Sequence, residues 1–400
     1  MSFVPHPTGS LAAFDTTPRT RLVFGNGVLG RLGALARETG AQRVLLVTDR
    51  GIVAAGHVAR ALDSLGAAGI SVTVYDAVQE NPTTLDVARC LAVAQGARPD
   101  LFIGLGGGSS MDTAKGTNFL LTNGGEMRDY WGVGKATRPM LPLIAVPTTA
   151  GTGSECQSAA LIADEATHQK MACLDPKAAA RVALLDPELT VSQPPRVTAV
   201  TGVDALAHAV ETAVTTGRNA VSLMYSHEAF KRLVHALPRV LAAPDHLEAR
   251  GQMLLGAALA GLAIEHSMLG AAHSAANPLT AHFNVVHGAA VGLMLPHVVR
   301  FNAAADDAIR LAYAELASAA ELATVSGGLE PAVEAVVGRL VMILDAAGIP
   351  RTLGDAGVDP SVLPRLADEA ARQWTATFNP RPCGAAEFAA LYHAACHPRA

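Results

Sequence analysis

The sequence predicts an α/β N-terminal domain followed by an all-α C-terminal domain. Its 400 residues are more than one hydrophobic core usually serves, so two domains are expected. Up to about residue 190, short β-branched runs alternate with helical stretches. After the SQPP segment at 192–195 the strand patterns stop and Ala/Leu-rich helical segments follow. We therefore place the domain boundary between residues 1–192 and 193–400.

Each expected strand in the first half is a short apolar run with turn residues at its ends. A helical segment with apolar residues at helical spacing, such as 83–97, separates neighbouring runs. This alternation predicts a mainly parallel sheet that helices cover on both faces. The expected strands are 21–25, 43–49, 71–76, 100–106, 141–149 and 181–186.

The second half reads as a series of helices broken by Gly, Pro and Asn. It shows neither an internal repeat nor a low-complexity tract. The clearest helical segments are 197–214, 220–237, 248–268 and 330–348.

Composition excludes several classes of partner and compartment. The 30 Lys and Arg against 35 Asp and Glu give a net charge near −5, which offers no basic field for nucleic acid or anionic lipid. No uninterrupted apolar run reaches the length of a membrane span, and the N-terminus lacks a signal-peptide pattern. The five cysteines are widely spaced without a C-x-x-C pair, which indicates reduced thiols in a cytoplasmic protein.

Two glycine clusters compete for the role of a phosphate-binding turn. GNGVLG at 25–30 has the spacing of a dinucleotide fingerprint, but the strand before it is short and reads as a sheet edge. The cluster at 104–116 follows a strand apolar enough to be buried on both faces. There Gly106, Gly107 and Gly108 remove side chains that would block a pyrophosphate, and Ser109 and Ser110 can cap a helix that begins at Met111. We predict that this second cluster binds the phosphates and that GNGVLG is a tight turn.

Two further segments are candidates for cofactor contacts. Asp49 ends the second strand, where its carboxylate can accept hydrogen bonds from ribose hydroxyls and would favour NAD over NADP. Spacing alone leaves it equally open that Asp49 caps the following helix. PTTAGTGSE at 147–155 places small hydroxyl residues at the end of another strand. Small residues of this kind would let a ligand approach the backbone closely. The alternative is an ordinary loop, which has the same composition.

Most of the 14 histidines lie in the helical half, and four polar residues there form a candidate metal site. Asp204 and His208 are four residues apart, one turn along one helix face. His273 and His287 are 14 residues apart with Asn-Pro between them, which allows a helix end, a turn and a second approach to the same point. Three imidazoles with one carboxylate suit Fe(II) or Zn better than Mg or Ca. Chance occurrence of the Asp-x-x-x-His pair remains the alternative.

Taken in order, the glycine cluster, PTTAGTGSE, GVDALAHAVE and the segment from His273 to His287 resemble the iron-containing (group III) alcohol dehydrogenases. The resemblance runs from about Thr20 to the end of the chain. It implies a dehydroquinate synthase-like fold, with an N-terminal NAD-binding α/β domain and a C-terminal helical metal domain. It also implies a homodimer or larger homo-oligomer. The metal positions it implies are Asp204, His208, His273 and His287. The cofactor positions it implies are Asp49, Gly106, Gly107, Gly108, Ser109, Asp112, Thr148, Thr149, Thr152 and Lys170.

One position departs from the family pattern. Many members have a histidine four residues after the first histidine of the His-x13-His segment, whereas this chain has Asn277. Asparagine cannot exchange a proton near neutral pH, so the proton must leave by another route. His282 is an additional candidate for that role, and a packed polar residue beside the site is the alternative.

The expected activity is a metal-dependent, NAD-linked alcohol dehydrogenase or aldehyde reductase. The metal acts as a Lewis acid on a small alcohol or aldehyde, and NAD carries the hydride. Alternatives on the same scaffold are a hydroxyacid–oxoacid transhydrogenase, a maleylacetate reductase-type enzyme and a dehydroquinate synthase-like lyase. The lyase would need basic residues for a phosphorylated substrate, and the metal segments carry few besides Arg218, Lys231 and Arg232. A non-catalytic NAD-sensing role fits poorly with an intact set of metal-binding residues.

Overall fold

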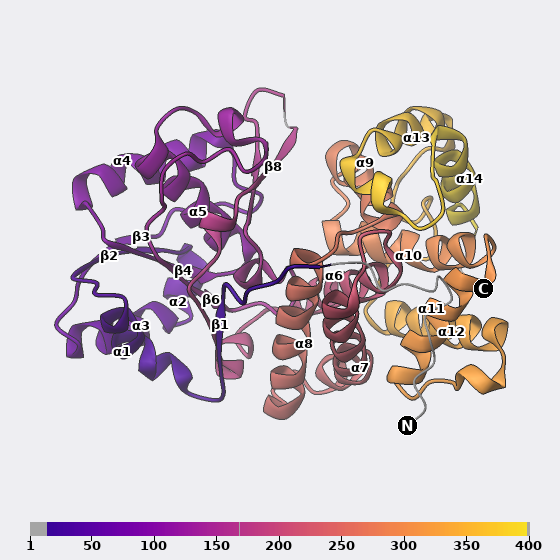
Figure 1. The fold of residues 1–400 in the computed structure, drawn as a ribbon, viewed down its shortest axis with the longest axis horizontal. Coiled ribbons are helices and arrows are strands. Elements are labelled where there is room, and N and C mark those ends of the chain that lie inside the picture. The colour runs from indigo at the N-terminus through magenta and orange to yellow at the C-terminus, as the bar shows by residue number, and fades with distance from the viewer. Residues whose placement is uncertain (1–13, 168, 398–400) are drawn as a thin grey trace. The chain divides into compact units, whose positions relative to one another are not determined.

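The computed structural model describes residues 14–167 and 169–397. They form two compact units, each drawn in Figure 1. The N-terminal unit is Thr17–Gln193, and the C-terminal unit comprises residues 194–397 together with 14–16.

A six-stranded sheet organises the N-terminal unit. Its strand order is β1-β9-β6-β4-β2-β3, and every neighbouring pair is parallel. The predicted parallel sheet is therefore confirmed, with β1 at one edge and β4 in the interior. The strands are β1 (Arg21–Phe24), β2 (Arg43–Val47), β3 (Ser71–Tyr75), β4 (Leu101–Gly106), β6 (Leu143–Pro147) and β9 (Val182–Leu185).

Both faces of this sheet are buried, as the continuous apolar strands predict. On β2, Val44 and Leu46 pack with α1 (Leu32–Glu38) and α3 (His57–Ala67). Leu45 and Val47 point to the other face, where they pack with α4 (Thr84–Ala97) and α5 (Gly108–Asn123). The short α2 (Arg50–Ala54) follows β2. The sheet is thus held as the middle layer between two helical layers.

A second, three-stranded sheet was not predicted from the sequence. Its order is β5-β8-β7, in which β5 and β8 are parallel but β7 and β8 are antiparallel. Its strands are β5 (Gly132–Val133), β7 (Ala159–Ala163) and β8 (Lys170–Leu174). Ala160, Ile162 and Met171 pack this sheet against Phe119 of α5. Short strands with few β-branched residues give little periodic signal, which explains why they were missed.

The C-terminal unit is built from helices, and no strand occurs among its described residues. The all-α prediction is confirmed. The helices are α6 (Pro195–Val214), α7 (Ala220–Ala242), α8 (Leu247–Glu265), α9 (Ala271–Phe283), α10 (His287–Ala303), α11 (Asp307–Ala319), α12 (Leu329–Ala346), α13 (Leu363–Ala371) and α14 (Ala385–Ala395).

Among the described residues, α8 is long and apolar enough to cross a membrane by length and composition, with a mean hydropathy of 1.2. This average includes polar and charged residues such as Glu248 and Arg250, which interrupt the apolar run as the sequence predicts. Within the unit, 67% of its 18-residue window is buried, as in the core helix of a globular domain.

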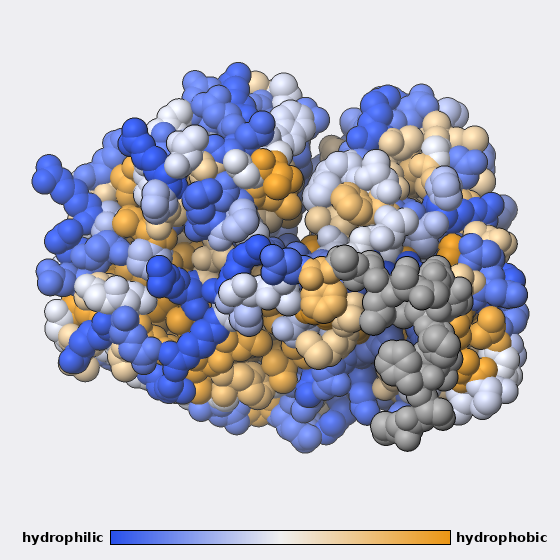
Figure 2. Space-filling view, viewed as in Figure 1, coloured by the Kyte–Doolittle hydropathy of each residue, from blue (hydrophilic) through white to orange (hydrophobic). Residues whose placement is uncertain are grey.

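The face drawn in Figure 2 is largely hydrophilic, with hydrophobic residues in separate patches. The most exposed large hydrophobic side chains are Val133 on β5, Met224 on α7 and Met342 on α12. They lie on three different elements.

Candidate metal centre and cofactor site

Helix α6 carries the first two candidate metal ligands on its buried side. Asp204 and His208 lie one turn apart, and both are at least nine-tenths buried. The helix runs unbroken from Pro195 to Val214, and a proline at its start is compatible with helix initiation because the first amides need no partner. The expected placement on one helix face is therefore found.

The other two candidates lie at the starts of consecutive helices, His273 on α9 and His287 on α10. The sequence allowed a helix end and a turn at the Asn-Pro pair, but the chain does not reverse there. Pro278 lies inside α9, which continues to Phe283. It reverses after Phe283, where Asn284 adopts the left-handed conformation with φ of 53°. Asparagine tolerates this region better than most residues, so the turn forms there.

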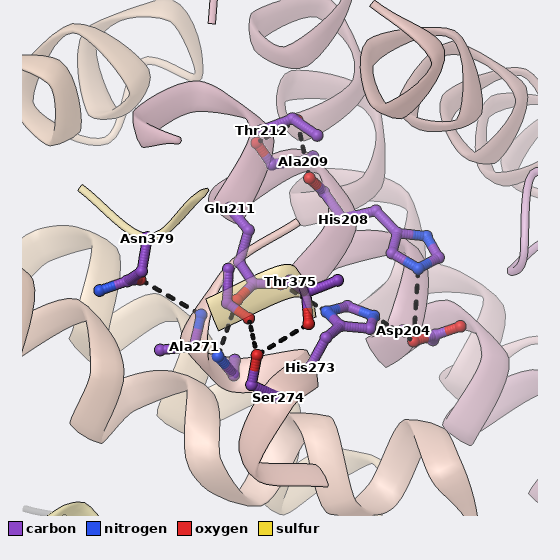
Figure 3. Close-up of polar contacts among 12 residues, drawn as sticks. Asp204, His208, Ala209, Glu211, Thr212, Ala271, His273, Ser274, Thr375 and Asn379 are labelled. Atoms are coloured by element: carbon purple, nitrogen blue, oxygen red, sulfur yellow. Dashed lines mark hydrogen bonds and ion pairs between the residues drawn. The ribbon is translucent and has the colours of Figure 1, made fainter. Parts of the chain in front are cut away.

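Three imidazoles converge on one carboxylate oxygen. Nε2 lies 3.6 Å from Asp204 Oδ1 in His208, 3.4 Å in His273 and 3.8 Å in His287. Figure 3 shows the rings of His208 and His273 turned toward Asp204. The His273 ring also lies beside those of His208 and His287, with centroids 4.9 and 5.4 Å apart. The structure therefore brings all four predicted residues together.

A close helix crossing sets this spacing. A Cβ atom on Gly288, the residue after His287, would lie 2.0 Å from the carbonyl oxygen of Val200 and 3.3 Å from Asp204 Cβ. Glycine is required here because any side chain would push α10 away from α6. The contact places the start of α10 directly beside Asp204.

Charge in this cluster is concentrated and buried. Burial would raise the pKa of the Asp204 carboxyl, but the neighbouring imidazoles, His208 foremost, hold it well below its ordinary value. Burial alone would lower the pKa of His273, but the carboxylates of Glu211 and Asp204 raise it to about 9. The cluster therefore favours a positive charge beside these carboxylates, and a proton or a metal cation can supply it.

The donor atoms of Asp204, His208 and His273 lie within 4.8 Å of one another, close enough to hold one metal ion, and His287 Nε2 lies 3.8 Å from Asp204 Oδ1 without joining that group of three. Asp204 Oδ1 and His273 Nε2 are buried yet make no hydrogen bond, which is costly for polar atoms without another ligand. Ligand atoms about 2.1 Å from a tetrahedral metal lie roughly 3.4 Å from one another. The separations of 3.4–3.8 Å from the Asp204 oxygen match that geometry closely.

In the N-terminal unit, the candidate cofactor residues follow three neighbouring strands. Asp49 follows β2, the glycine turn ends β4, and Thr148 follows β6. The chain proceeds outward from β2 to β3 and then returns to the other side of β2 with β4. Ligands of open α/β sheets bind at the carboxyl ends of the strands where the order reverses in this way. Asp49 and Gly106 lie on the two sides of that point.

The glycine turn brings β4 and α5 close together. Gly106 has a φ of 149°, and a Cβ atom on it would lie 2.4 Å from Ser110 Oγ and 3.6 Å from Asp49 Oδ2. A Cβ atom on Gly108 would lie 2.9 Å from Thr152 Oγ1. A Cβ atom on Gly107 would make only ordinary contacts, the nearest of them with Thr149 Cγ2 at 3.5 Å. Gly107 is therefore the one glycine of the three that local packing does not require.

The start of α5 differs from the expectation that serines cap it. The helix begins at Gly108, its N-cap is Gly107, and no side chain caps it. Ser109 lies inside the first turn and accepts a hydrogen bond from the amide of Asn81 at 3.3 Å. The glycines shift the helix start upstream because they allow the chain to turn sharply out of β4. The N–H groups of this turn consequently lack a side-chain cap, which is compatible with anion binding.

Asp49 caps α2, since its Oδ1 accepts a hydrogen bond from the amide of Ile52 at 3.1 Å. The capping alternative is thus found, and Oδ2 is the atom that lies toward Gly106. The loop after β6 is tied to the glycine turn by a hydrogen bond of 2.9 Å from the Thr148 amide to the Gly106 carbonyl. Thr149 and Thr152 are half-buried beside Gly107 and Gly108.

Buried Lys115 holds this loop in place. Its ammonium donates to the carbonyls of Ser154, Gln157 and Ala159 at 2.6–2.9 Å and to Ser154 Oγ at 3.0 Å. Asp112 is also buried, accepts a hydrogen bond of 2.8 Å from Ser154 Oγ, and has a pKa raised by burial. Asp112 therefore braces the loop. Lys170 is exposed at the start of β8.

GNGVLG forms the tight turn expected of it. Gly27 has a φ of 69° and precedes a short 3₁₀ helix at Val28–Arg31. The amides of Gly27 and Leu29 both donate to the Asp186 carboxylate at 3.0 Å. These two N–H groups are therefore not available to a phosphate.

Comparison with known proteins matches almost the whole chain to one family. The family described as iron-containing alcohol dehydrogenase matches residues 18–187, and its C-terminal counterpart matches residues 198–396. Lactaldehyde reductase of Escherichia coli (strain K12) is 35% identical over 374 residues, covering 93% of this chain and 97% of the relative. The chain belongs to the iron-containing alcohol dehydrogenase family.

Solved structures agree with that assignment. A crystal structure of 1,3-propanediol oxidoreductase has a TM-score of 0.90 at 32% identity and covers 94% of this chain and 98% of its own. Sulfoacetaldehyde reductase from Bifidobacterium kashiwanohense, in complex with NAD+, has a TM-score of 0.87 at 26% identity and covers 96% and 99%. The predicted family, fold class and alcohol dehydrogenase type of enzyme are confirmed, and these findings support NAD and iron as the cofactors.

Glu211 also contacts the cluster, although it was not among the residues predicted for the site. It is buried, and its carboxylate accepts a hydrogen bond from His273 Nδ1. The signal was present, because Glu211 lies seven residues after Asp204 and three after His208, on the same face of one helix.

Two other positions considered from the sequence are engaged elsewhere in this alcohol dehydrogenase. His282 lies on the exposed last turn of α9, where Nε2 contacts Glu369 at 2.6 Å. The structure thus pairs it with α13 and does not bring it into the Asp204 cluster. Asn277 donates a hydrogen bond of 3.0 Å to Gln373 Oε1.

Proposed function

We propose that this chain is an NAD-dependent alcohol dehydrogenase and aldehyde reductase that uses a divalent metal, Fe(II) or Zn, held by Asp204, His208, His273 and His287. One observation carries the proposal: three imidazole Nε2 atoms surround a single buried carboxylate oxygen at 3.4–3.8 Å. This donor set suits iron and zinc and lacks the oxygen-rich character that Mg or Ca requires. The match to the iron-containing alcohol dehydrogenase family supports iron.

When bound, the metal supplies a Lewis acid for the substrate oxygen, and NAD supplies or accepts the hydride. The four side chains would hold the cation, and Asp204, His208 and His273 are buried, where charge interactions are strong. Asp204 contributes the single anionic donor and the three histidines contribute neutral ones. Because two of the donors come from one turn of α6 and two from the start of helices, the set is positioned by rigid elements.

The N-terminal unit provides the proposed NAD site at the end of β4. Gly107, Gly108 and Ser109 would present backbone N–H groups to the pyrophosphate, and Asp49 Oδ2 would accept from the ribose. Thr149 and Thr152 border the same turn, and Thr148 fixes it through the backbone. Gly106 allows the close turn, and Asp112 holds the loop after β6 through Ser154. Lys170, exposed at the start of β8, remains a proposed cofactor contact.

The substrate class we propose is a small alcohol or aldehyde. Relatives with this reaction class include the lactaldehyde reductase and the 1,3-propanediol oxidoreductase named above. We also propose a homodimer or larger homo-oligomer, which rests on the family resemblance, and a cytoplasmic location, which rests on the widely spaced cysteines.

Anaerobic purification followed by elemental analysis tests the metal, and NADH absorbance with a panel of alcohols and aldehydes tests the reaction. We expect about one iron or zinc per chain, and NADH that accumulates in proportion to the alcohol consumed. Full activity in metal-free protein would contradict the proposal. A bound nicotinamide that cycles without release would instead indicate the transhydrogenase, and turnover without net NADH formation would indicate the lyase.

A further inference from the structure

Glu211 links the two helices that carry candidate metal ligands. It lies on α6, is 3% exposed, and reaches the start of α9. Its Oε2 accepts a hydrogen bond from His273 Nδ1 (Figure 3). Its Oε1 accepts one of 2.7 Å from the amide of Ala272. Each carboxylate oxygen therefore has its own donor on α9.

The backbone leaves space for this arrangement. A Cβ atom on Gly270 would lie 3.2 Å from Glu211 Oε1 and 3.0 Å from Asn379 Oδ1. Asn379 Oδ1 in turn accepts a hydrogen bond of 3.2 Å from the amide of Ala271. The first amides of α9 thus donate to two side-chain acceptors, and a carboxylate is favourable at the positive end of a helix.

The contact determines which ring nitrogen of His273 is available. A neutral imidazole has one N–H donor and one acceptor nitrogen, and the donor must face the Glu211 carboxylate. The lone pair is then on Nε2, which lies 3.4 Å from Asp204 Oδ1. The opposite tautomer would place two acceptors against each other and turn an N–H toward the cluster.

We propose that Glu211 is a positioning residue of the metal centre, which fixes the tautomer and ring orientation of His273 so that Nε2 faces the cation. This inference rests on the proposed function. Glu211 touches neither substrate nor cation in this role and acts through His273. It also adds a second buried negative charge beside Asp204, so that the two carboxylates together match the charge of a divalent metal.

The substitution Glu211→Gln tests the role with little change in size. Each Glu211 oxygen has its own donor, so in glutamine one of the two donors, His273 Nδ1 or the Ala272 amide, would face an NH2 group in place of an acceptor. We expect the Kd for Zn²⁺, measured by chelator competition with the metal-depleted full chain, to weaken roughly 10- to 100-fold. We also expect the visible absorption spectrum of the Co(II)-loaded protein to change.

Ser274→Ala is the matched control. Ser274 Oγ donates to the Gly270 carbonyl at 2.9 Å and pairs with Thr375 Oγ1 at 2.7 Å. It therefore supports the same helix turn through side-chain hydrogen bonds, but it makes no hydrogen bond with the His273 ring. We expect its Zn²⁺ Kd to stay within about twofold of the wild type.

The outcomes separate this inference from the proposed function. Wild-type protein that binds no metal would overturn both. Wild-type protein that binds Zn²⁺, with E211Q binding equally well, would overturn the inference alone, as would an equal loss in E211Q and S274A. If E211Q fails to fold, E211D carries the test, because it keeps the charge but withdraws the carboxylate by one methylene. We expect E211D to weaken Zn²⁺ binding as well, and unchanged binding would overturn the inference.

Discussion

A Cβ atom added to Gly107 would lie 3.5 Å from its nearest neighbour, Thr149 Cγ2, which is an ordinary contact distance. The φ of Gly107, −75°, is one that any residue can adopt. Neither packing nor backbone conformation in the protein therefore requires glycine at this position. The neighbouring Gly108 is different, because its added Cβ would lie 2.9 Å from Thr152 Oγ1.

The first prediction separates packing from ligand binding at this turn. Gly107→Ala should leave the Tm unchanged but weaken NADH binding at least roughly tenfold, because the methyl group would stand where the pyrophosphate approaches. Gly108→Ala should lower both the Tm and the affinity. Fluorescence titration with NADH and thermal unfolding give the two readouts. Gly96→Ala, in the open on α4, is the control, and normal NADH binding by G107A would contradict the assignment.

The second prediction concerns cofactor selectivity. Asp49→Asn keeps an oxygen that can cap α2 but removes the charge that would repel a 2′-phosphate. We expect an unchanged Tm and a preference for NADH over NADPH that falls roughly tenfold in kcat/KM, equivalent to about 1.4 kcal/mol. An unchanged preference would show that the Asp49 carboxylate does not face the ribose.

The third prediction concerns Lys115. Lys115→Met would leave the carbonyls of Ser154, Gln157 and Ala159 without this donor. Each buried unsatisfied group costs about 1–3 kcal/mol, so we expect a destabilisation of roughly 3 kcal/mol or more, together with weaker NADH binding. Denaturant unfolding and NADH titration measure the two effects. The exposed Lys177→Met serves as the comparison, and a K115M protein with normal unfolding would refute the bracing role.

The fourth prediction concerns pH. Burial raises the pKa of Glu155 to about 7, and its Oε1 makes no hydrogen bond. The unfolded chain ionises this group near 4.5, so ionisation costs stability increasingly as pH rises from 4.5 to 7 and costs it fully above 7. Glu155→Gln mimics the protonated form. It should stabilise the protein by up to roughly 3 kcal/mol at pH 8 and by little at pH 4.5. A pH-independent difference in Tm would contradict this.

The fifth prediction concerns the metal centre. His273→Ala should lower kcat at least roughly a thousandfold, since Lewis-acid activation contributes several kcal/mol to the barrier. NADH binding should stay near that of the wild type, because the proposed cofactor residues belong to the other unit. Steady-state kinetics with an NADH titration make the comparison. Near-wild-type kcat in a variant shown to lack metal would remove His273 from the site.

Much of the fold could be predicted because its signals are periodic. Apolar runs such as Val44–Val47 lie in a sheet buried on both faces, where every residue of the strand is hydrophobic. The strand at Ala159–Ala163 carries alanines at an edge of a small sheet, and such a run does not differ in pattern from a helix or loop. Its pairing with β8 depends on packing against α5 that the sequence does not reveal.

The candidate site could be assembled only in part for a related reason. Asp204 and His208 lie within one helix, so their proximity follows from helix geometry. The position of His273 depends instead on how α9 packs against α6, and that packing includes the Glu211 carboxylate. The reversal at Asn284 was misplaced to the Asn-Pro pair because proline is a strong helix-breaking signal, whereas packing retains Pro278 inside α9.

The crossing of α6 and α10 at Gly288 limits how this centre can be altered. Because main-chain atoms of Val200 meet Gly288, the separation between Asp204 and His287 is insensitive to changes in surrounding side chains. Mutational drift or a laboratory library can therefore vary neighbouring positions widely while the coordination geometry persists. A substitution at Gly288 itself offers no such latitude, since even one methyl group would force the two helices apart and disperse the donors.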